Sequence, residues 1–154
     1  MNAAKQMLLI NQADRKLQPF NAAGKVTVPP KGWISTIRGA MKMSLSQMGK
    51  RLKISPQSVK ELEEREASGT ITINTLRQAG KVLNMKLIYG FVPMDKSIEK
   101  MIDKQAHKVA RDLVMRTSQN MKLEDQATSQ AQVRRSIEQK ALEIKMKMPK
   151  QLWD

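Results

Sequence analysis

Apolar residues recur mainly every three to four positions along this chain of 154 residues. This spacing places them on one face of an amphipathic helix, so the pattern predicts a succession of helices. Prolines and glycines fall between the periodic stretches and mark the turns. The predicted helices cover about residues 3–18, 33–41, 44–52, 56–64, 72–84, 96–115 and 123–146.

One segment departs from the helical pattern. Residues 85–92 read MKLIYGFV and are rich in strand-forming residues, as is the run GTITI at residues 69–73, so together they predict a short β element. The expected fold class is therefore mainly α, with a short β element and C-terminal helices. The expected domains are an N-terminal helix and extended arm (1–32), a domain of short helices with a strand at 85–92 (33–92), and a C-terminal helical region for dimerisation or partner binding (93–154).

Composition excludes several classes of function. The chain has no cysteine, which excludes disulfides, zinc–thiolate sites and thiol catalysis, and its one histidine excludes a two-histidine metal site. We therefore expect no metal, no cofactor and no enzymatic activity. No apolar run reaches the roughly 18 residues that a membrane span needs, so a cytoplasmic, nucleoid-associated protein is expected. The 12 methionines lie mainly at core-like helical positions, which predicts that they fill the interior.

Charge then favours a particular kind of partner. The chain carries 28 Lys and Arg against 14 Asp and Glu, a formal net charge of +14. Such an excess favours a polyanion, of which nucleic acid is the commonest. Between Asp14 and Glu61 there are ten basic residues and no acidic one, which predicts a surface that attracts phosphate. The ten are Arg15, Lys16, Lys25, Lys31, Arg38, Lys42, Lys50, Arg51, Lys53 and Lys60.

Residues 44–64 have the spacing of a helix-turn-helix motif. Ser44 begins a capping-box pattern S-x-x-Q, and Ser55-Pro56 is an N-cap followed by proline at the first helical position. Gly49 supplies a small residue where the two helices meet. The second helix of such a pair fits the major groove of B-DNA, and polar residues at its start face the bases. The apolar residues that lock the pair are Met48, Leu52, Ile54, Val59 and Leu62, and the polar candidates are Gln57, Ser58, Lys60 and Glu61.

The stretch SLSQMGKRLKISPQSVKELE, residues 44–63, resembles the lambda-repressor-like, XRE-type helix-turn-helix, whose pattern is T-Q-x-x-L-A-x-x-L-G-V-S-x-x-x-I-x-x-L-E. This chain departs from that pattern at Leu45, where the family has Gln, at Lys53, where it has the turn Gly, and at Pro56, which has no donor for a base. Lys53 must therefore bear a strained backbone or a reshaped turn. The resemblance implies base-reading roles for Ser55, Gln57, Lys60 and Glu61, and phosphate contacts from Ser44, Gln47, Lys50, Arg51, Lys53 and Ser58.

A longer resemblance covers roughly residues 5–115. The segments DRKLQPF (14–20), GWISTIRGAMKMS (32–44) and EASGTITINTLRQAGKVLNMKLIYGFVP (66–93) are similar to the bacterial family called mobile mystery protein A. This resemblance implies a regulator encoded on a mobile element beside a Fic-domain protein. The family of Fic-inhibiting helices carries [ST]-x-x-x-E-[GN], and none of the eight glutamates here has Ser or Thr four positions earlier. Restraint of a Fic partner would therefore use another contact, or act on transcription.

Two functions are expected on these grounds. The first is a sequence-specific transcriptional repressor of its own operon, binding a palindromic double-stranded DNA operator as a homodimer with half-sites about one helical turn apart. The C-terminal helices or the segment 85–92 would form the dimer. The alternative is an antitoxin-like protein whose residues 95–154 bind and restrain a neighbouring Fic-domain toxin, and the two functions are compatible.

Overall fold

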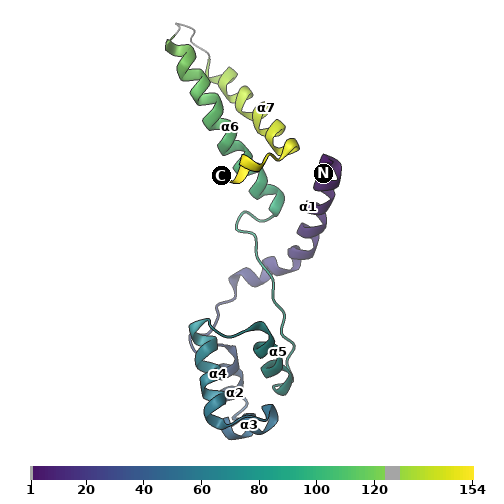
Figure 1. The fold of residues 1–154 in the computed structure, drawn as a ribbon, viewed down its shortest axis with the longest axis vertical. Helices are drawn as coiled ribbons and strands as arrows, with labels where there is room; N and C mark the ends of the chain where they lie inside the picture. The colour runs from purple at the N-terminus through teal and green to yellow at the C-terminus, as the bar shows by residue number, and fades with distance from the viewer. Residues whose placement is uncertain (1, 124–128) are drawn as a thin grey trace. The chain divides into compact units, whose positions relative to one another are not determined.

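The computed structural model of the protein describes residues 2–123 and 129–154. These residues are mainly helical, as the periodicity predicts, and no strand occurs among them. The chain divides into two compact units, which we call the central unit (residues 25–89) and the terminal unit (residues 1–24 and 90–154). Figure 1 shows helices α2 to α5 in the central unit and α1, α6 and α7 in the terminal unit.

Three of the four helices of the central unit begin at capping residues that can be read from the sequence, Ser44, Ser55 and Thr72. The Ser44 side chain accepts from the Gln47 N–H at 3.1 Å and the Gln47 side chain accepts from the Ser44 N–H at 2.8 Å, which confirms the predicted capping box. Thr72 caps α5 in a similar way, accepting from the Thr75 N–H at 3.1 Å. Helix α4 runs about four residues further than predicted and ends at Gly69, whose φ is 81°. The helices are α2 (Trp33–Ala40), α3 (Leu45–Leu52), α4 (Pro56–Ser68) and α5 (Ile73–Val82).

One apolar core holds the central unit together. Burial of side chains of this size contributes roughly 1.5–3 kcal/mol each. Ile54, which the sequence assigns to locking the helix pair, is instead exposed, and Trp33 and Met41 are exposed as well. Trp33 is the first residue of α2 and Met41 follows its last residue. At the two ends of this short helix, no neighbouring element of the described chain covers the side chain. The core consists of Ile34, Met48, Val59, Leu62, Ala79 and Leu83.

The β element expected at residues 85–92 and 69–73 is not present among the described residues. A strand needs a hydrogen-bonded partner, and residues 69–72 are occupied in ending α4 and beginning α5. The N–H groups of Thr70 and Ile71 both bond to the carbonyl of Arg65, at 2.9 and 3.2 Å. Residues 85–92 follow α5 without regular secondary structure. Strand-forming composition alone therefore did not produce a strand in this single chain.

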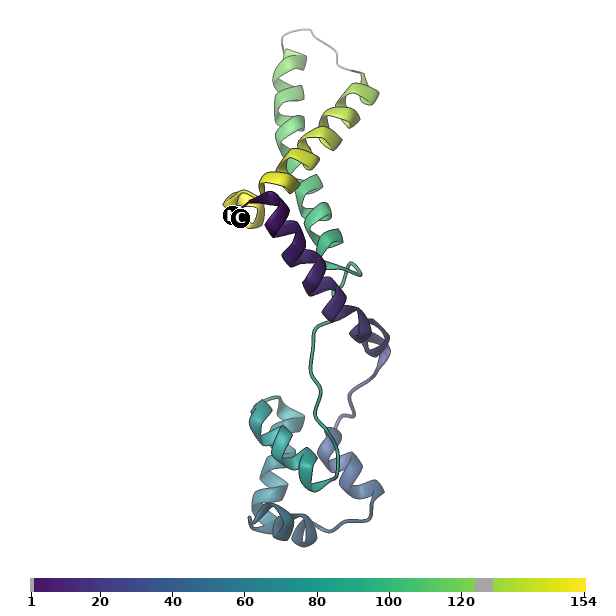
Figure 2. The ribbon, with the colours of Figure 1, turned by 90° about the vertical axis from the view of Figure 1, so that its right-hand side faces the viewer.

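The terminal unit combines both ends of the sequence. Helices α6 (Ile98–Leu123) and α7 (Gln130–Lys147) pack side by side, and α1 (Ala3–Leu17) crosses α6 (Figure 2). Two 3-10 helices, η1 (Gln18–Lys25) and η2 (Lys150–Trp153), follow α1 and α7. Alanines at the contact allow the helix backbones to approach closely. The core of this unit consists of Ile10, Ile102, Ala106, Ala110, Ala141, Ile144 and Leu152.

Polar contacts fix the two ends of the chain in this unit. The Asp14 carboxylate accepts from the N–H of Ile98 at 2.7 Å and of Glu99 at 3.2 Å, so α1 caps the start of α6. The Gln105 amide donates to the Leu152 carbonyl at 2.7 Å and holds η2. The N-terminal helix, which the sequence separates as part of an arm, therefore shares a core with the C-terminal helices.

The methionines do not follow the sequence-based expectation. Among the ten whose exposure the structure describes, only Met48 is buried. Three more are half-buried, and six are exposed. The expectation fails because an unbranched apolar residue at a helical spacing fits the rim of a core as readily as its centre. The exposed six are Met41, Met85, Met94, Met101, Met115 and Met146.

The close approach at Gly49 gives a first prediction. A Cβ added to Gly49 would lie 2.6 Å from the Ile54 carbonyl oxygen, which is backbone and cannot rotate away. Gly49→Ala should therefore lower the free energy of unfolding by about 1–3 kcal/mol. The measurement is urea denaturation of the full chain in a Trp153→Phe background, so that Trp33 fluorescence reports on the central unit.

Gly39 is the matched control, because it also lies in a short helix but a Cβ there would meet nothing within 4 Å. Gly39→Ala should raise the free energy of unfolding by about 0.5 kcal/mol through helix propensity. Equal effects of the two alanines would contradict a specific contact at Gly49.

Candidate nucleic-acid interface

The turn between α3 and α4 fixes the angle of the two helices that carry the predicted site residues. The Ile54 N–H donates to the Gly49 carbonyl at 2.9 Å, and Gly49 itself is buried. Lys53 adopts the left-handed conformation with φ 59° and ψ 42°, which confirms that a non-glycine residue bears strain here. That strain costs on the order of 1 kcal/mol relative to glycine. A chain that tolerates it must gain from the surrounding packing or from the lysine itself.

Helix α4 presents one polar face outward. Gln57, Lys60 and Glu61 are all exposed and lie at positions i, i+3 and i+4, so the helix brings them onto one face. The opposite face is buried through Val59 and Leu62. In the described part of the chain, none of the three polar side chains has a hydrogen-bond or ion-pair partner. The base-reading set predicted from the sequence is thus brought together, apart from Ser55.

Ser55 and three of the predicted phosphate contacts are engaged in capping the helices. The Ser55 hydroxyl accepts from the Ser58 N–H at 3.0 Å and lies 2.8 Å from the Ser58 hydroxyl. Ser44 and Gln47 satisfy each other at the start of α3. These four side chains set where α3 and α4 begin. Their first contribution to any interface is therefore the placement of the helix N-terminus, where backbone N–H groups favour an anion.

The cations at the end of α3 lie on the surface. Lys50 and Arg51 lie in the last turn of α3, and Lys53 lies in the turn that follows. All three are exposed. Arg51 also donates to the Val82 carbonyl at 3.4 Å, which ties it weakly to the end of α5. Lys42 was not singled out in the sequence as a site residue, although it is exposed with a left-handed φ of 53° in the α2–α3 turn. In the sequence, Lys42 is marked only by its place among the ten basic residues between Asp14 and Glu61.

All four acidic residues of the central unit lie on α4, and two of them face inward. The Glu63 carboxylate pairs with the Arg38 guanidinium, and this pair includes an Nη2–Oε2 distance of 3.2 Å. Arg38 also donates to the Met43 carbonyl at 2.8 Å. The hydrogen bond that Arg38 donates to Glu63 and the charge of that carboxylate raise the pKa of Arg38 against the opposing effect of burial. The sequence predicts that Arg38 is one of ten basic residues on a surface that attracts phosphate. This prediction is wrong, because Glu63 neutralises the charge of Arg38.

Glu66 fixes α4 to the start of α2. Its two carboxylate oxygens accept from the N–H groups of Trp33 and Ile34, each at 2.8 Å. The N-cap of α2 is Gly32, with φ 83°, and a Cβ there would lie 2.7 Å from the Glu66 carboxylate. Gly32 has no side chain that could bond to the free N–H groups at the start of α2. That lack is the one local feature of the sequence that points to a cap from a distant residue.

The surface that remains is strongly positive. The central unit has 12 Lys and Arg against four Glu, a formal net charge of +8. Glu63 and Glu66 are turned inward, so Glu61 and Glu64 are its exposed carboxylates. Seven exposed cations from the acid-free stretch lie in this unit. They are Lys25, Lys31, Lys42, Lys50, Arg51, Lys53 and Lys60.

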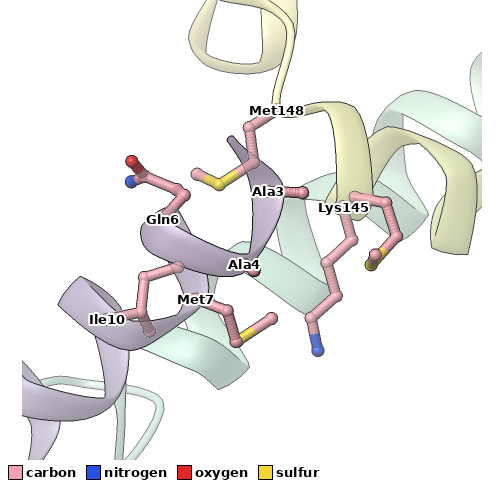
Figure 3. A pocket seen from close by; sticks show the side chains of 8 residues that line it. Ala3, Ala4, Gln6, Met7, Ile10, Lys145 and Met148 are labelled. Atoms are coloured by element: carbon pink, nitrogen blue, oxygen red, sulfur yellow. The ribbon is translucent and has the colours of Figure 1, made fainter. Parts of the chain in front are cut away.

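The terminal unit has a different surface feature. A groove of about 270 Å³ lies between α1 and the end of α7 and is lined mainly by apolar atoms (Figure 3). Ala3, Met7 and Met148 point into it, and the Lys145 amine extends away toward Asp103 and Glu99, at 2.8 and 3.0 Å. The groove contains none of the site residues predicted from the sequence.

The described residues also bear on metal binding and on membrane insertion. Within residues 2–123 and 129–154, no cluster of three or more His, Asp or Glu is arranged to hold a metal ion. His107 is exposed on α6, and its Nδ1 lies 3.0 Å from the Asp103 carbonyl oxygen of its own helix. None of the helices, as far as they are described, is long and apolar enough to cross a membrane.

Comparison of the chain with protein-family models gives no match. Comparisons with curated proteins and with solved structures also give none. The function must therefore be argued from the residues and geometry of this chain.

The Arg38–Glu63 pair gives a second prediction. Arg38→Met leaves the Glu63 carboxylate, whose side chain is 10% exposed, without its cation, and this should cost about 2–4 kcal/mol of unfolding free energy. Arg38→Met combined with Glu63→Met should return to within about 1 kcal/mol of the parent, because apolar side chains of similar volume replace the pair. Urea denaturation of the parent, both single variants and the double variant measures the coupling. A double variant as unstable as the sum of the single variants would refute the pairing.

Proposed function

We propose that this protein is a sequence-specific DNA-binding transcriptional regulator in which α3 and α4 act as a helix-turn-helix. The observation that carries the proposal is the outward face of α4. Gln57, Lys60 and Glu61 lie together there without partners in the described chain, on a unit of formal charge +8. An exposed polar helix face beside unpaired cations fits the major groove of duplex DNA.

Each residue of the face has a role set by its chemistry. The Gln57 amide can pair bidentately with adenine, the Lys60 amine can donate to the guanine acceptors, and the Glu61 carboxylate can accept from cytosine N4. Lys50, Arg51 and Lys53 at the end of α3 would contact phosphates, and they supply affinity that does not depend on sequence. At the capped start of α4, Pro56 has no N–H and the Ser58 N–H bonds to Ser55, so the Gln57 N–H is the one that could meet a further phosphate.

Glu61 and Glu64 give the face its selectivity. A carboxylate near the phosphate backbone disfavours binding to an arbitrary duplex. The cost is offset where cytosine N4 donates to the carboxylate. Glu61 would therefore discriminate by rejecting wrong sequences as well as by binding the right one.

The biological role that fits this chemistry is repression of the protein's own operon on a mobile element, from a palindromic operator bound by two copies. A two-fold DNA site with half-sites about one helical turn apart requires two α4 helices related by the same symmetry. One copy supplies one such helix, so a homodimer is the form in which we expect the protein to act.

A second function is favoured by one observation. The terminal unit has its own core and contains none of the predicted DNA-contact residues. It is therefore available to bind a protein, and an antitoxin-like restraint of a neighbouring Fic-domain enzyme is the second candidate. Because Ile10 and Asp14 belong to this unit, a fragment of residues 95–154 would lack part of its core. Co-purification should use the full chain, and absence of the Fic protein from the eluate would count against this function.

Base reading by α4 gives a third prediction. Gln57→Ala should weaken binding to the cognate operator by about 1–3 kcal/mol and leave binding to random duplex unchanged. Gln57 is exposed on α4, so stability should not change. Fluorescence anisotropy with the upstream region of the gene and with a shuffled duplex, at ~150 mM salt, measures both. Wild-type protein that prefers neither duplex would refute the proposed function.

Phosphate contact gives a fourth prediction. Lys50→Ala should weaken binding to cognate and random DNA alike and should reduce the slope of log K against log salt by about one. Lys108→Ala is the matched control, since Lys108 is an exposed lysine on α6 in the terminal unit. Identical salt slopes for the Lys50 and Lys108 variants would show that α3 does not lie against the backbone.

A further inference from the structure

The segment from Met85 to Met94 is the most exposed apolar stretch of the described chain. Ile88 is 68% exposed, Phe91 81% and Met94 97%, and Tyr89 is 62% exposed. Single exposed apolar residues are ordinary, but a run of them marks an interaction surface. The segment links α5 to α6, so it cannot be dismissed as a frayed end of the chain.

Within this segment, the backbone from Lys86 to Val92 is also without hydrogen-bond partners among the described residues. The Met85 N–H bonds to the Gly80 carbonyl at 2.7 Å, and the next backbone bond along the chain is from Lys96 to Pro93 at 3.2 Å. Between them, no N–H or carbonyl group from Lys86 to Val92 has a hydrogen-bond partner among the described residues. A segment rich in strand formers with unpaired backbone groups is a template for strand pairing with another chain.

The charge on the chain indicates which partner can approach. Two copies of a protein of net charge +14 repel each other, so a contact between copies is least costly at an uncharged segment. No charged residue lies between Leu87 and Met94. An apolar segment whose one charge, Lys86, lies near its end is complementary to itself, because antiparallel pairing places the two copies of Lys86 at opposite ends.

The exposed area is sufficient for a dimer. Large apolar side chains carry on the order of 150–250 Å² each. Allowing for their fractional exposure, the six exposed apolar residues of the segment offer at most roughly 800 Å², and a standard interface buries about that area on each partner. The six residues are Met85, Ile88, Tyr89, Phe91, Val92 and Met94.

We infer that residues 86–92 pair antiparallel with the same residues of a second copy of this chain and form the dimer. A two-fold axis through the segment makes the two strands antiparallel and self-complementary. The pairing satisfies the backbone groups that a single chain leaves open, and it explains why a strand-forming sequence is not a strand in one copy. It specifies the dimer that the proposed function requires, but it is tested without DNA.

Helix α7 offers the competing surface. Leu142 and Met146 are exposed at i and i+4 on its outward face, 61% and 53% respectively. Their helix already satisfies its own backbone hydrogen bonds, so covering them gains only apolar burial. The segment 86–92 gains both burial and hydrogen bonds, which is why it is the stronger surface.

The first test is the mass of the full chain in solution. Sedimentation equilibrium without DNA should show a dimer for the wild type. Ile88→Lys and Phe91→Lys should give monomers with unchanged circular dichroism, because both side chains are exposed and their replacement leaves the cores intact. Leu142→Lys, the matched change on α7, should remain a dimer. A monomeric wild type, or a dimer that Leu142→Lys dissociates and Ile88→Lys does not, overturns the inference.

The second test locates the axis and uses the absence of native cysteine. Single cysteines are placed at each position from 86 to 92 except Gly90, where a Cβ would lie 2.7 Å from the Phe20 ring, and are oxidised. A residue on the two-fold axis faces its own copy at about 4.5–5.5 Å between Cα atoms, within disulfide range. Cross-linking should peak at one or two adjacent positions and fall on both sides, and Leu142→Cys should not cross-link. A flat profile overturns the antiparallel pairing.

The outcomes separate this inference from the proposed function. A dimer that shows no preference for any duplex retains the strand pairing and refutes DNA reading. A monomer that binds the operator specifically retains DNA reading and refutes the strand pairing.

Discussion

The attachment of α4 to α2 is the constraint on which the central unit depends. Glu63 holds Arg38, and Glu66 caps the first N–H groups of α2, so two successive turns of α4 are fixed against one neighbour. Charge-assisted hydrogen bonds of this kind are stronger and more directional than apolar contacts. They determine the rotation of α4 about its axis. With the inner face fixed by Glu63 and Glu66, the face carrying Gln57, Lys60 and Glu61 must point to solvent.

The same attachment shapes the electrostatics of the surface. A carboxylate that binds a buried guanidinium or a helix N-terminus no longer offsets the exposed lysines around it. The terminal unit uses Asp14 in a similar way, at the start of α6, and Asp103 and Glu99 hold Lys145. The hydrogen bond that Lys145 donates to Asp103 is the main cause that raises the pKa of Lys145. The protein thus uses several of its acids for internal structure and leaves the central unit with a positive exterior.

The sequence predicts local features well and distant ones poorly. The capping box of Ser44 and Gln47, the Ser55-Pro56 start and the need for glycine at 49 depend on neighbours within a few residues, so they can be read from the chain. The Glu66 cap joins residues 33 apart and the Asp14 cap joins residues 84 apart, so no local pattern reveals them. Of the expected site, the α4 face and the Ser55 cap could be predicted, but the pairing of Arg38 with Glu63, which lies 25 residues away, could not.

Residues 85–92 show why a correct reading of composition can still give the wrong element. The residue types are those of a strand, but secondary structure in a sheet belongs to a pair of segments and not to one. Within one copy, the nearest candidate partner, residues 69–73, is used to end α4 and begin α5. The strand preference is therefore unsatisfied in the single chain. A preference that is encoded in sequence but unmet in the monomer is itself an argument for a second copy.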